Sequence, residues 1–235
     1  MKTSNCHKAW GTIAIVLLAL GCATTKQARN TKASPFLGDA ASLLKPGNEG
    51  QALLVYIKPD VQWQKYQKVV IEPVTYWVGK DEDDSLKEPE RKALTDYCYA
   101  QLKKQFSKSY TVVDTPGPDT LTYSGALINA EKSWPVMTTV ASVIPQAVAL
   151  STLKNVTTGK PAGVGAVHGE VKVTDSLTGD QLLVASDKRV GGMGWQGKTN
   201  KWEAVESSAR YWAQQSVYRL CTLQGRTDCK EPTEG

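Results

Sequence analysis

The chain has 235 residues, 41% of them hydrophobic, and a formal net charge of +5. This length is enough to bury the core of one ordinary domain. The charge is too small to indicate nucleic-acid binding, and two histidines cannot supply a histidine-rich metal site. We therefore expect no nucleic-acid partner and no bound metal.

Residues 1–21 are predicted to be a signal peptide. Lys2 and Lys8 give a basic start, and an uncharged apolar run follows over 13–20. That run is shorter than the roughly 20 apolar residues that a membrane-spanning helix needs. The small residue Gly21 closes it, which is the secretory pattern. Export to an oxidising compartment would permit disulfide bonds.

The tetrapeptide Ala19-Leu20-Gly21-Cys22 resembles the lipobox of bacterial lipoproteins, although Ala19 stands where the motif more often has Leu. The resemblance implies cleavage between Gly21 and Cys22, a thioether-linked diacylglycerol on Cys22, and an N-acyl chain such as palmitate. Each buried CH₂ contributes about 0.8 kcal/mol, so two or three chains form a lasting anchor. Ala23 replaces the aspartate that usually signals inner-membrane retention, which implies the outer membrane, facing the periplasm. The alternative is an ordinary signal peptide with a cysteine there by chance.

Small and polar residues dominate 22–50, and we predict that this segment is a lipidated flexible tether. The folded domain is predicted over 51–225, with a C-terminal tail over 226–235. Cys221 and Cys229 are joined by the turn-like stretch TLQGRTD, which predicts a disulfide between them. That disulfide would tie the tail to the last helix.

The domain is predicted to be a single α+β unit in the order β-α-β-β-β-β-α. We expect a mostly antiparallel sheet with two amphipathic helices packed on one face. Pro73 removes a ladder donor from the strand that contains it, so that strand is expected at an edge or bulged. The predicted strands are 53–57, 67–78, 110–114, 121–131, 163–174 and 182–190, and the helices begin near Glu88, with Pro89 in the first turn, and near Asn200.

An apolar insertion over 134–162, interrupted by Pro145, separates two of these strands. Loops of this length usually carry structure or a function. One interpretation is a pair of short helices that closes the core, and the other is a projection that contacts a partner or a membrane. Trp134 and Trp195 flank loops and are candidate partner contacts, with packing at the core edge as the alternative.

The chemistry of the chain is sparse. His168 is the one histidine after the signal peptide, and Glu170 lies on the same face of its strand. The pair is a candidate for proton transfer, and the alternative is a solvated sheet face or a structural hydrogen bond. No G-x-S-x-G signature is present. We therefore assign no catalytic residue and no cofactor beyond the acyl chains on Cys22, and interpret Cys98 as a buried free thiol.

A family resemblance covers roughly residues 22–222. The segment LVYIKPDVQWQKYQKVVIEPVTYW, residues 54–77, is similar to the opening of a bacterial lipoprotein family, domain of unknown function 3313. The hairpin Asp175-Ser-Leu-Thr-Gly179 resembles the Asp-Ser-x-x-Gly hairpin of that family. The family has no assigned activity, so the resemblance implies a membrane-tethered periplasmic α+β domain and supplies no catalytic residues.

Two functional hypotheses follow. The first is a non-enzymatic accessory or interaction factor of the cell envelope, which binds an envelope protein or a cell-wall polymer. The second is a periplasmic enzyme, or a protein that binds a small ligand or the cell wall, with an unrecognised site, for which His168 and Glu170 are the starting point.

Overall fold

The computed structural model describes residues 25–78, 86–132, 164–191 and 201–233. Several sequence-based predictions lie outside these ranges and stay predictions: the signal peptide, Cys22, the insertion 134–162, Trp134 and Trp195. The described ranges form a single α+β domain, as expected.

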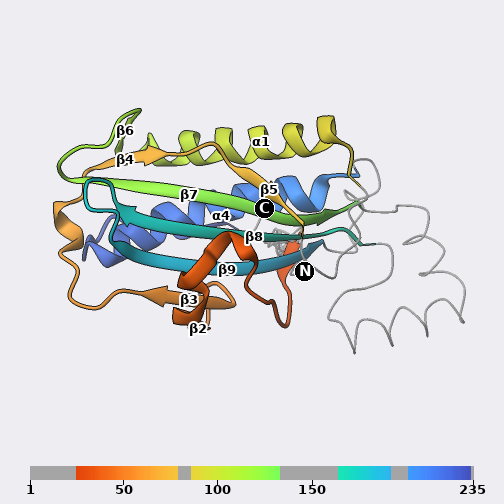
Figure 1. Ribbon diagram of the computed structural model, residues 1–235, viewed down its shortest axis with the longest axis horizontal. Helices are drawn as coiled ribbons and strands as arrows, with labels where there is room; N and C mark the ends of the chain where they lie inside the picture. Colours follow the sequence, from red (N-terminus) through yellow and green to blue (C-terminus); the bar gives the residue numbers. More distant parts are fainter. Residues whose placement is uncertain (1–24, 79–85, 133–163, 192–200, 234–235) are drawn as a thin grey trace, which may run out of the picture.

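The described strands form one mixed sheet in the order β2-β3-β9-β8-β7-β4-β6, with β1 beside β9 and β5 beside β7 (Figure 1). Five of its strand pairs are antiparallel, and the three that involve β4 or β5 are parallel. The sheet is therefore mostly antiparallel, as predicted. The strands are β1 Thr25–Gln27, β2 Lys45–Pro46, β3 Leu54–Ile57, β4 Lys68–Ile71, β5 Thr75–Trp77, β6 Thr111–Val113, β7 Thr120–Glu131, β8 Ala166–Asp175 and β9 Gln181–Gly191.

Two long helices, α1 (Glu88–Phe106) and α4 (Glu203–Leu223), pack against each other and on one face of the sheet (Figure 1). Pro89 stands in the first turn of α1, where its missing N–H costs nothing. The apolar side of α1, as expected of an amphipathic helix, is buried and includes Leu94, Cys98, Leu102 and Phe106. Two short 3-10 helices, η1 (Pro35–Leu43) and η2 (Trp63–Lys65), complete the described elements.

The strand expected over 67–78 is two strands. β4 ends at Ile71 and β5 begins at Thr75, and both run parallel to β7. Pro73 lies in the gap, where its lack of an N–H interrupts the ladder.

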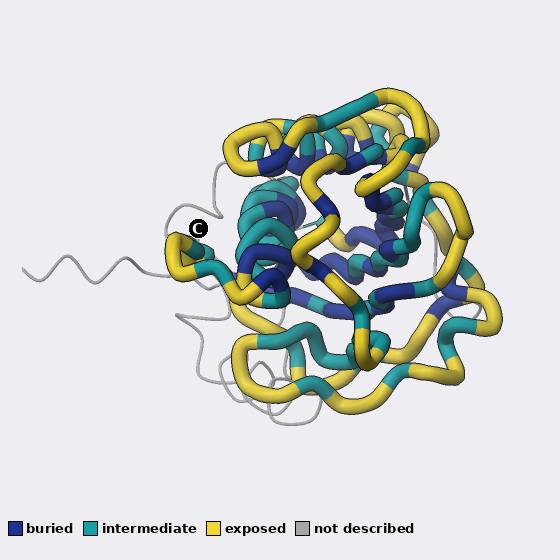
Figure 2. Tube along the Cα trace, turned by 90° about the vertical axis from the view of Figure 1, so that its left-hand side faces the viewer, coloured by how far each residue is buried: buried dark blue, intermediate teal, exposed yellow. Residues whose placement is uncertain are grey.

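The core lies between the sheet and the two helices, where buried residues gather (Figure 2). The helix layer and the sheet approach closely where α4 crosses β8. A Cβ added to Gly169 would lie 2.7 Å from the ring of Trp212, so only glycine permits this approach. Trp212 in turn donates from Nε1 to Asp187 Oδ2 at 2.7 Å, which fixes the ring.

The predicted tether is wrong over its described part. Residues 25–44, here called the strap, pair with β9 through β1 and then cross the sheet face opposite α4, with η1 against β8 and β9 (Figure 1). Thr25, Ser34 and Leu37 are buried. Main-chain pairing and polar contacts hold most of the strap in place. It therefore needs no run of apolar residues, and its composition looks like that of a linker.

Candidate functional site

A row of three side chains on β8 holds the strap. His168, Glu170 and Lys172 alternate along the strand and so point to the same face, as the sequence predicts. His168 Nε2 lies 3.1 Å from Thr31 Oγ1, and Lys172 Nζ donates to the carbonyl oxygen of Phe36 at 3.0 Å. The strap covers this face, so the alternative of a solvated face is wrong, and the hydrogen bonds to the strap match the structural alternative.

Glu170 is the centre of this row. Its carboxylate accepts from the backbone N–H of Ser34 at 2.8 Å, from the hydroxyl of Ser34 at 2.5 Å and from the hydroxyl of Ser186 at 3.1 Å. Its side chain is 0% exposed. Burial alone would raise the pKa of Glu170, but hydrogen bonds from His168 and Ser34 outweigh it and hold that pKa below its ordinary value. The ionised carboxylate therefore stabilises the docked strap.

The geometry around His168 differs from that of a catalytic triad. In a triad the histidine bridges nucleophile and acid through two different ring nitrogens. Here Nε2 alone faces Ser186 Oγ at 2.8 Å, Glu170 Oε1 at 3.4 Å and Thr31 Oγ1 at 3.1 Å. His168, Glu170 and Ser186 are all buried. These contacts match a structural network under the strap.

A buried arginine fixes the first residue of the strap. Arg189 of β9 donates to Thr25 Oγ1 at 3.0 Å and to the carbonyl oxygen of Thr25 at 3.1 Å. The guanidinium lies 3.8 Å from the ring centroid of Tyr211 on α4. Thr25 is thereby tied to the sheet and, through Arg189, to the helix layer.

The two sequence motifs of the family resemblance meet in space. Tyr66 donates its hydroxyl hydrogen to Asp175 Oδ2 at 2.8 Å, and Asp175 Oδ1 accepts from the backbone N–H groups of Leu177 and Thr178. Gly179 closes the turn with a φ of 71°. Burial acts to raise the pKa of Asp175, but these hydrogen bonds dominate and hold that pKa well below its usual range. The motifs therefore form a structural joint at one end of the sheet.

An apolar cavity of about 160 Å³ lies between the sheet and the two helices. Its walls include Val55, Leu102, Val171 and Ala213. An apolar cavity of about 150 Å³ in another protein stays dry and binds benzene or xenon.

Part of the cavity lining comes from α4 and the loop that precedes β3. Gln51, Gln215 and Arg219 belong to this polar part of the lining and are half-buried. Gln215 Nε2 donates to the carbonyl oxygen of Gly50 at 2.7 Å, and Arg219 donates to the same oxygen. These residues, which the sequence analysis missed, are here called the rim. These residues are far apart in the sequence, and they meet only because the sheet register places the loop before β3 next to α4.

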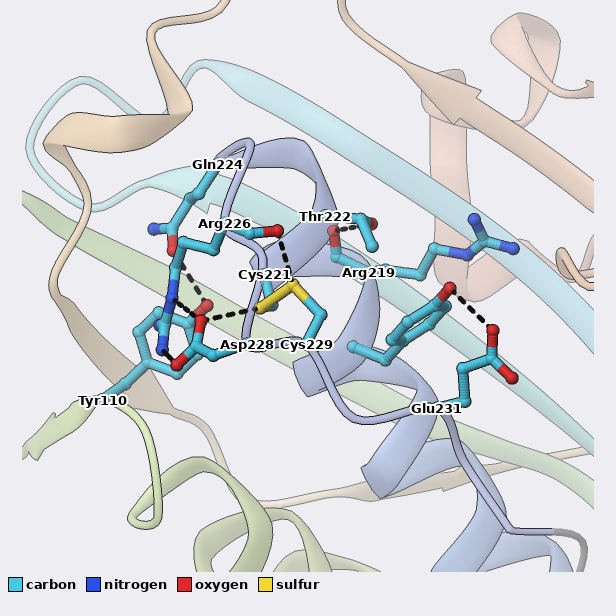
Figure 3. Close-up of a disulfide and its surroundings, with 10 residues drawn as sticks. Tyr110, Arg219, Cys221, Thr222, Gln224, Arg226, Asp228, Cys229 and Glu231 are labelled. Atoms are coloured by element: carbon cyan, nitrogen blue, oxygen red, sulfur yellow. Dashed lines mark hydrogen bonds and ion pairs between the residues drawn. A yellow bond between two sulfur atoms is a disulfide. The ribbon is translucent and has the colours of Figure 1, made fainter.

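The expected disulfide between Cys221 and Cys229 is present and joins the tail to α4 (Figure 3). Asp228 lies beside it, and the three side chains would otherwise suggest metal ligands. The disulfide occupies both sulfurs, so this cluster offers no thiolate. Cys98 is a buried free thiol, as predicted, and burial raises its pKa to about 12.

The similar proteins identify a family, but they do not identify an activity. The chain is 25% identical over 118 residues to the uncharacterized lipoprotein YdcL of Escherichia coli, both strain K12 and O157:H7, which is 50% of this chain and 53% of the relative. The chain thus matches about half the length of these curated relatives. No helix among the described residues is long and apolar enough to cross a membrane.

Solved structures give distant likenesses. The PelC dodecamer from Paraburkholderia phytofirmans matches at 9% identity and a TM-score of 0.36, over 66% of this chain and 94% of that one. A variant of the same protein matches at 11% identity and a TM-score of 0.33, over 65% and 92%. The family model described as protein of unknown function, DUF3313, matches residues 32–216, and the chain belongs to that family.

Proposed function

We propose that this protein is a lipoprotein of the cell envelope, held by acyl chains on Cys22 at the outer membrane and facing the periplasm as a non-enzymatic accessory or interaction factor. The position of β1 carries the proposal. Thr25 is the third residue after Cys22 and is buried in the sheet. Three residues span at most about 11 Å, so the anchor would hold the domain at the membrane surface.

This placement differs from that of a domain joined to its anchor by a long flexible tether. The strap fixes its own first residue through Arg189, and Glu170 fixes Ser34 further along. An anchored protein of this build would present one side to the membrane and the rest to the periplasm. A partner such as an envelope protein or a cell-wall polymer would then be met close to the membrane. The lipoprotein relatives support the anchor.

The non-enzymatic role is favoured by the way His168 and Glu170 are used. Both are buried, and the strap supplies partners to each. From the side of the strap, a substrate could reach them only after the strap had left the sheet. The second hypothesis, an enzyme or small-ligand site at this pair, is therefore the weaker one.

Fractionation of cells that produce the parent and Cys22→Ser proteins tests the anchor. The parent is expected in the outer-membrane fraction, whereas the Cys22→Ser protein should stay unprocessed and incorporate no labelled palmitate. A matched variant with a flexible linker of about 12 residues after Ala23, a length that relaxes the reach limit, should keep the lipid and the fraction. A Cys22→Ser protein that is processed and retained like the parent would overturn the proposal.

In-cell crosslinking followed by mass spectrometry tests the interaction role. The linker variant is expected to lose crosslinks to partners at the membrane surface while it stays anchored. His168→Gln removes the imidazole and keeps a hydrogen-bonding side chain. It should capture the same partners as the parent and complement a deletion strain equally well. Loss of complementation by a folded His168→Gln protein would favour the enzyme hypothesis.

A further inference from the structure

The apolar cavity is lined by a long stretch of both α4 and β7. Its lining on α4 extends from Ala209 to Leu223, which is about 21 Å at 1.5 Å per residue. On the sheet it follows β7 from Leu121 to Leu127, which is about 20 Å at 3.4 Å per residue. A lining that extends over such a length suits a slender hydrocarbon chain better than a compact ring.

The interior of the cavity offers little to a polar ligand. Its walls are mainly aliphatic and aromatic side chains from the two helices and the sheet. The hydroxyl groups of Tyr123 and Ser216 lie 2.7 Å apart and satisfy each other. Burial raises the pKa of Tyr123 to about 12, so its hydroxyl is neutral. A ligand in this cavity gains from the burial of apolar surface.

Polar chemistry is found at the rim. Arg219 is half-buried on α4, with its guanidinium next to the ring of Tyr218 and bonded to the carbonyl oxygen of Gly50. A guanidinium has five N–H donors, and the bond to Gly50 uses one. An anionic or polar head group at the rim would meet this charge while its chain lay inside.

The rim lies beside the start of the strap. Gln27 of β1 donates from Nε2 to the carbonyl oxygen of Gln51 at 2.8 Å and to Asp187 Oδ1 at 2.7 Å. Gln51 and Asp187 both line the cavity. β1 and β3 pair with successive parts of the same edge of β9. The rim therefore lies next to β1, the described strand that is nearest in sequence to Cys22.

We propose that this cavity binds a single unbranched acyl chain, with an anionic or polar head group at Arg219. The ligand would be a lipid of the membrane to which the protein is anchored, either a fatty acid or one chain of a phospholipid. The inference rests on the proposed function only for the supply of lipid, because the cavity and its rim belong to the folded domain.

A photoactivatable palmitic acid that carries a diazirine and an alkyne tests the inference. Cells that produce the full-length protein take up the probe and are irradiated, and the purified protein is digested and mapped. Adducts are expected on peptides from β3 and α4. Label on the peptide that contains Cys22 reports lipidation separately, so failure of the anchor and failure of the cavity are distinguishable. The adduct mass separates a free fatty acid from a phospholipid.

Two substitutions on β3 sharpen the test. Val55 lines the cavity and is half-buried, and its neighbour Tyr56 points to the opposite face. Val55→Trp should lower the β3 and α4 adducts roughly tenfold or more, while Tyr56→Trp leaves them within about twofold. Arg219→Gln should lower the yield without moving the adducts.

The inference is overturned by adducts confined to the Cys22 peptide, by adducts spread over surface peptides, or by equal labelling of the Val55→Trp and Tyr56→Trp proteins. If Val55→Trp does not fold, Ala213→Leu on α4 fills the same cavity from its other wall and replaces it. Equal labelling of a folded Ala213→Leu protein and the parent would also overturn the inference.

Discussion

Replacement of Glu170 by glutamine should loosen the strap. The side chain keeps its size and loses its charge, in a position where three N–H or O–H groups point at the carboxylate. A hydrogen bond to a charged group contributes about 1.5–3 kcal/mol, against about 1 kcal/mol for a neutral pair. The loss is therefore about 1 kcal/mol for each of the three bonds, or about 3 kcal/mol in all.

Urea denaturation and amide hydrogen exchange measure this loss. We expect a lower free energy of unfolding and faster exchange in the strap, especially at Ser34, whose N–H donates to Glu170. Glu72→Gln is the matched control, because Glu72 accepts one bond from Ser124 on the exposed surface. Its effect should stay within about 0.5 kcal/mol. A Glu170→Gln protein that matches this control in both measurements would refute the reasoning.

Three further predictions concern stability. The pKa of Glu170 is lowered on folding, so its contribution is complete above the ordinary value of 4.5 and lost as pH falls through the lower folded-state pKa; denaturation from pH 7 to about pH 3 should be less pH-dependent for Glu170→Gln than for the parent. Replacing Cys221 and Cys229 together by serine should cost about 2–3 kcal/mol, because the disulfide closes a loop with a sequence separation of 8; thermal unfolding that is identical for reduced parent, oxidised parent and the variant would contradict this. Gly169→Ala should cost about 1–3 kcal/mol, because its Cβ meets the fixed ring of Trp212; an unchanged urea midpoint would show that the ring can move.

Much of the fold is predictable because its elements carry local signals. Each of these signals arises within a short stretch of sequence. They are the apolar side of α1, the proline in its first turn, and the residues of β7 and β8 that alternate between the two faces of the sheet. The break at Pro73 follows from its missing N–H. The disulfide was predictable because Cys221 and Cys229 are close in sequence. Local patterns of this kind report on the elements that contain them.

The strap and the rim were not predictable in the same way. Ser34 contacts Glu170 across 136 residues, and Arg219 contacts Gly50 across 169. Nothing near either residue in the sequence indicates its partner. The main chain of β9 and the polar row on β8 supply the hydrogen bonds that hold the strap. The strap itself can therefore have a linker-like composition. The cavity, likewise, is a property of how two helices and a sheet fit together.

The central claim is that acyl chains on Cys22 anchor the protein directly before the strap. The most direct test is the mass of the N-terminal tryptic peptide of protein extracted from membranes. After denaturation and digestion, the peptide Cys22–Lys26 should carry a diacylglycerol on sulfur and an acyl chain on the amino group. A mature protein that begins elsewhere, or an unmodified Cys22, would contradict the anchored arrangement proposed for this protein.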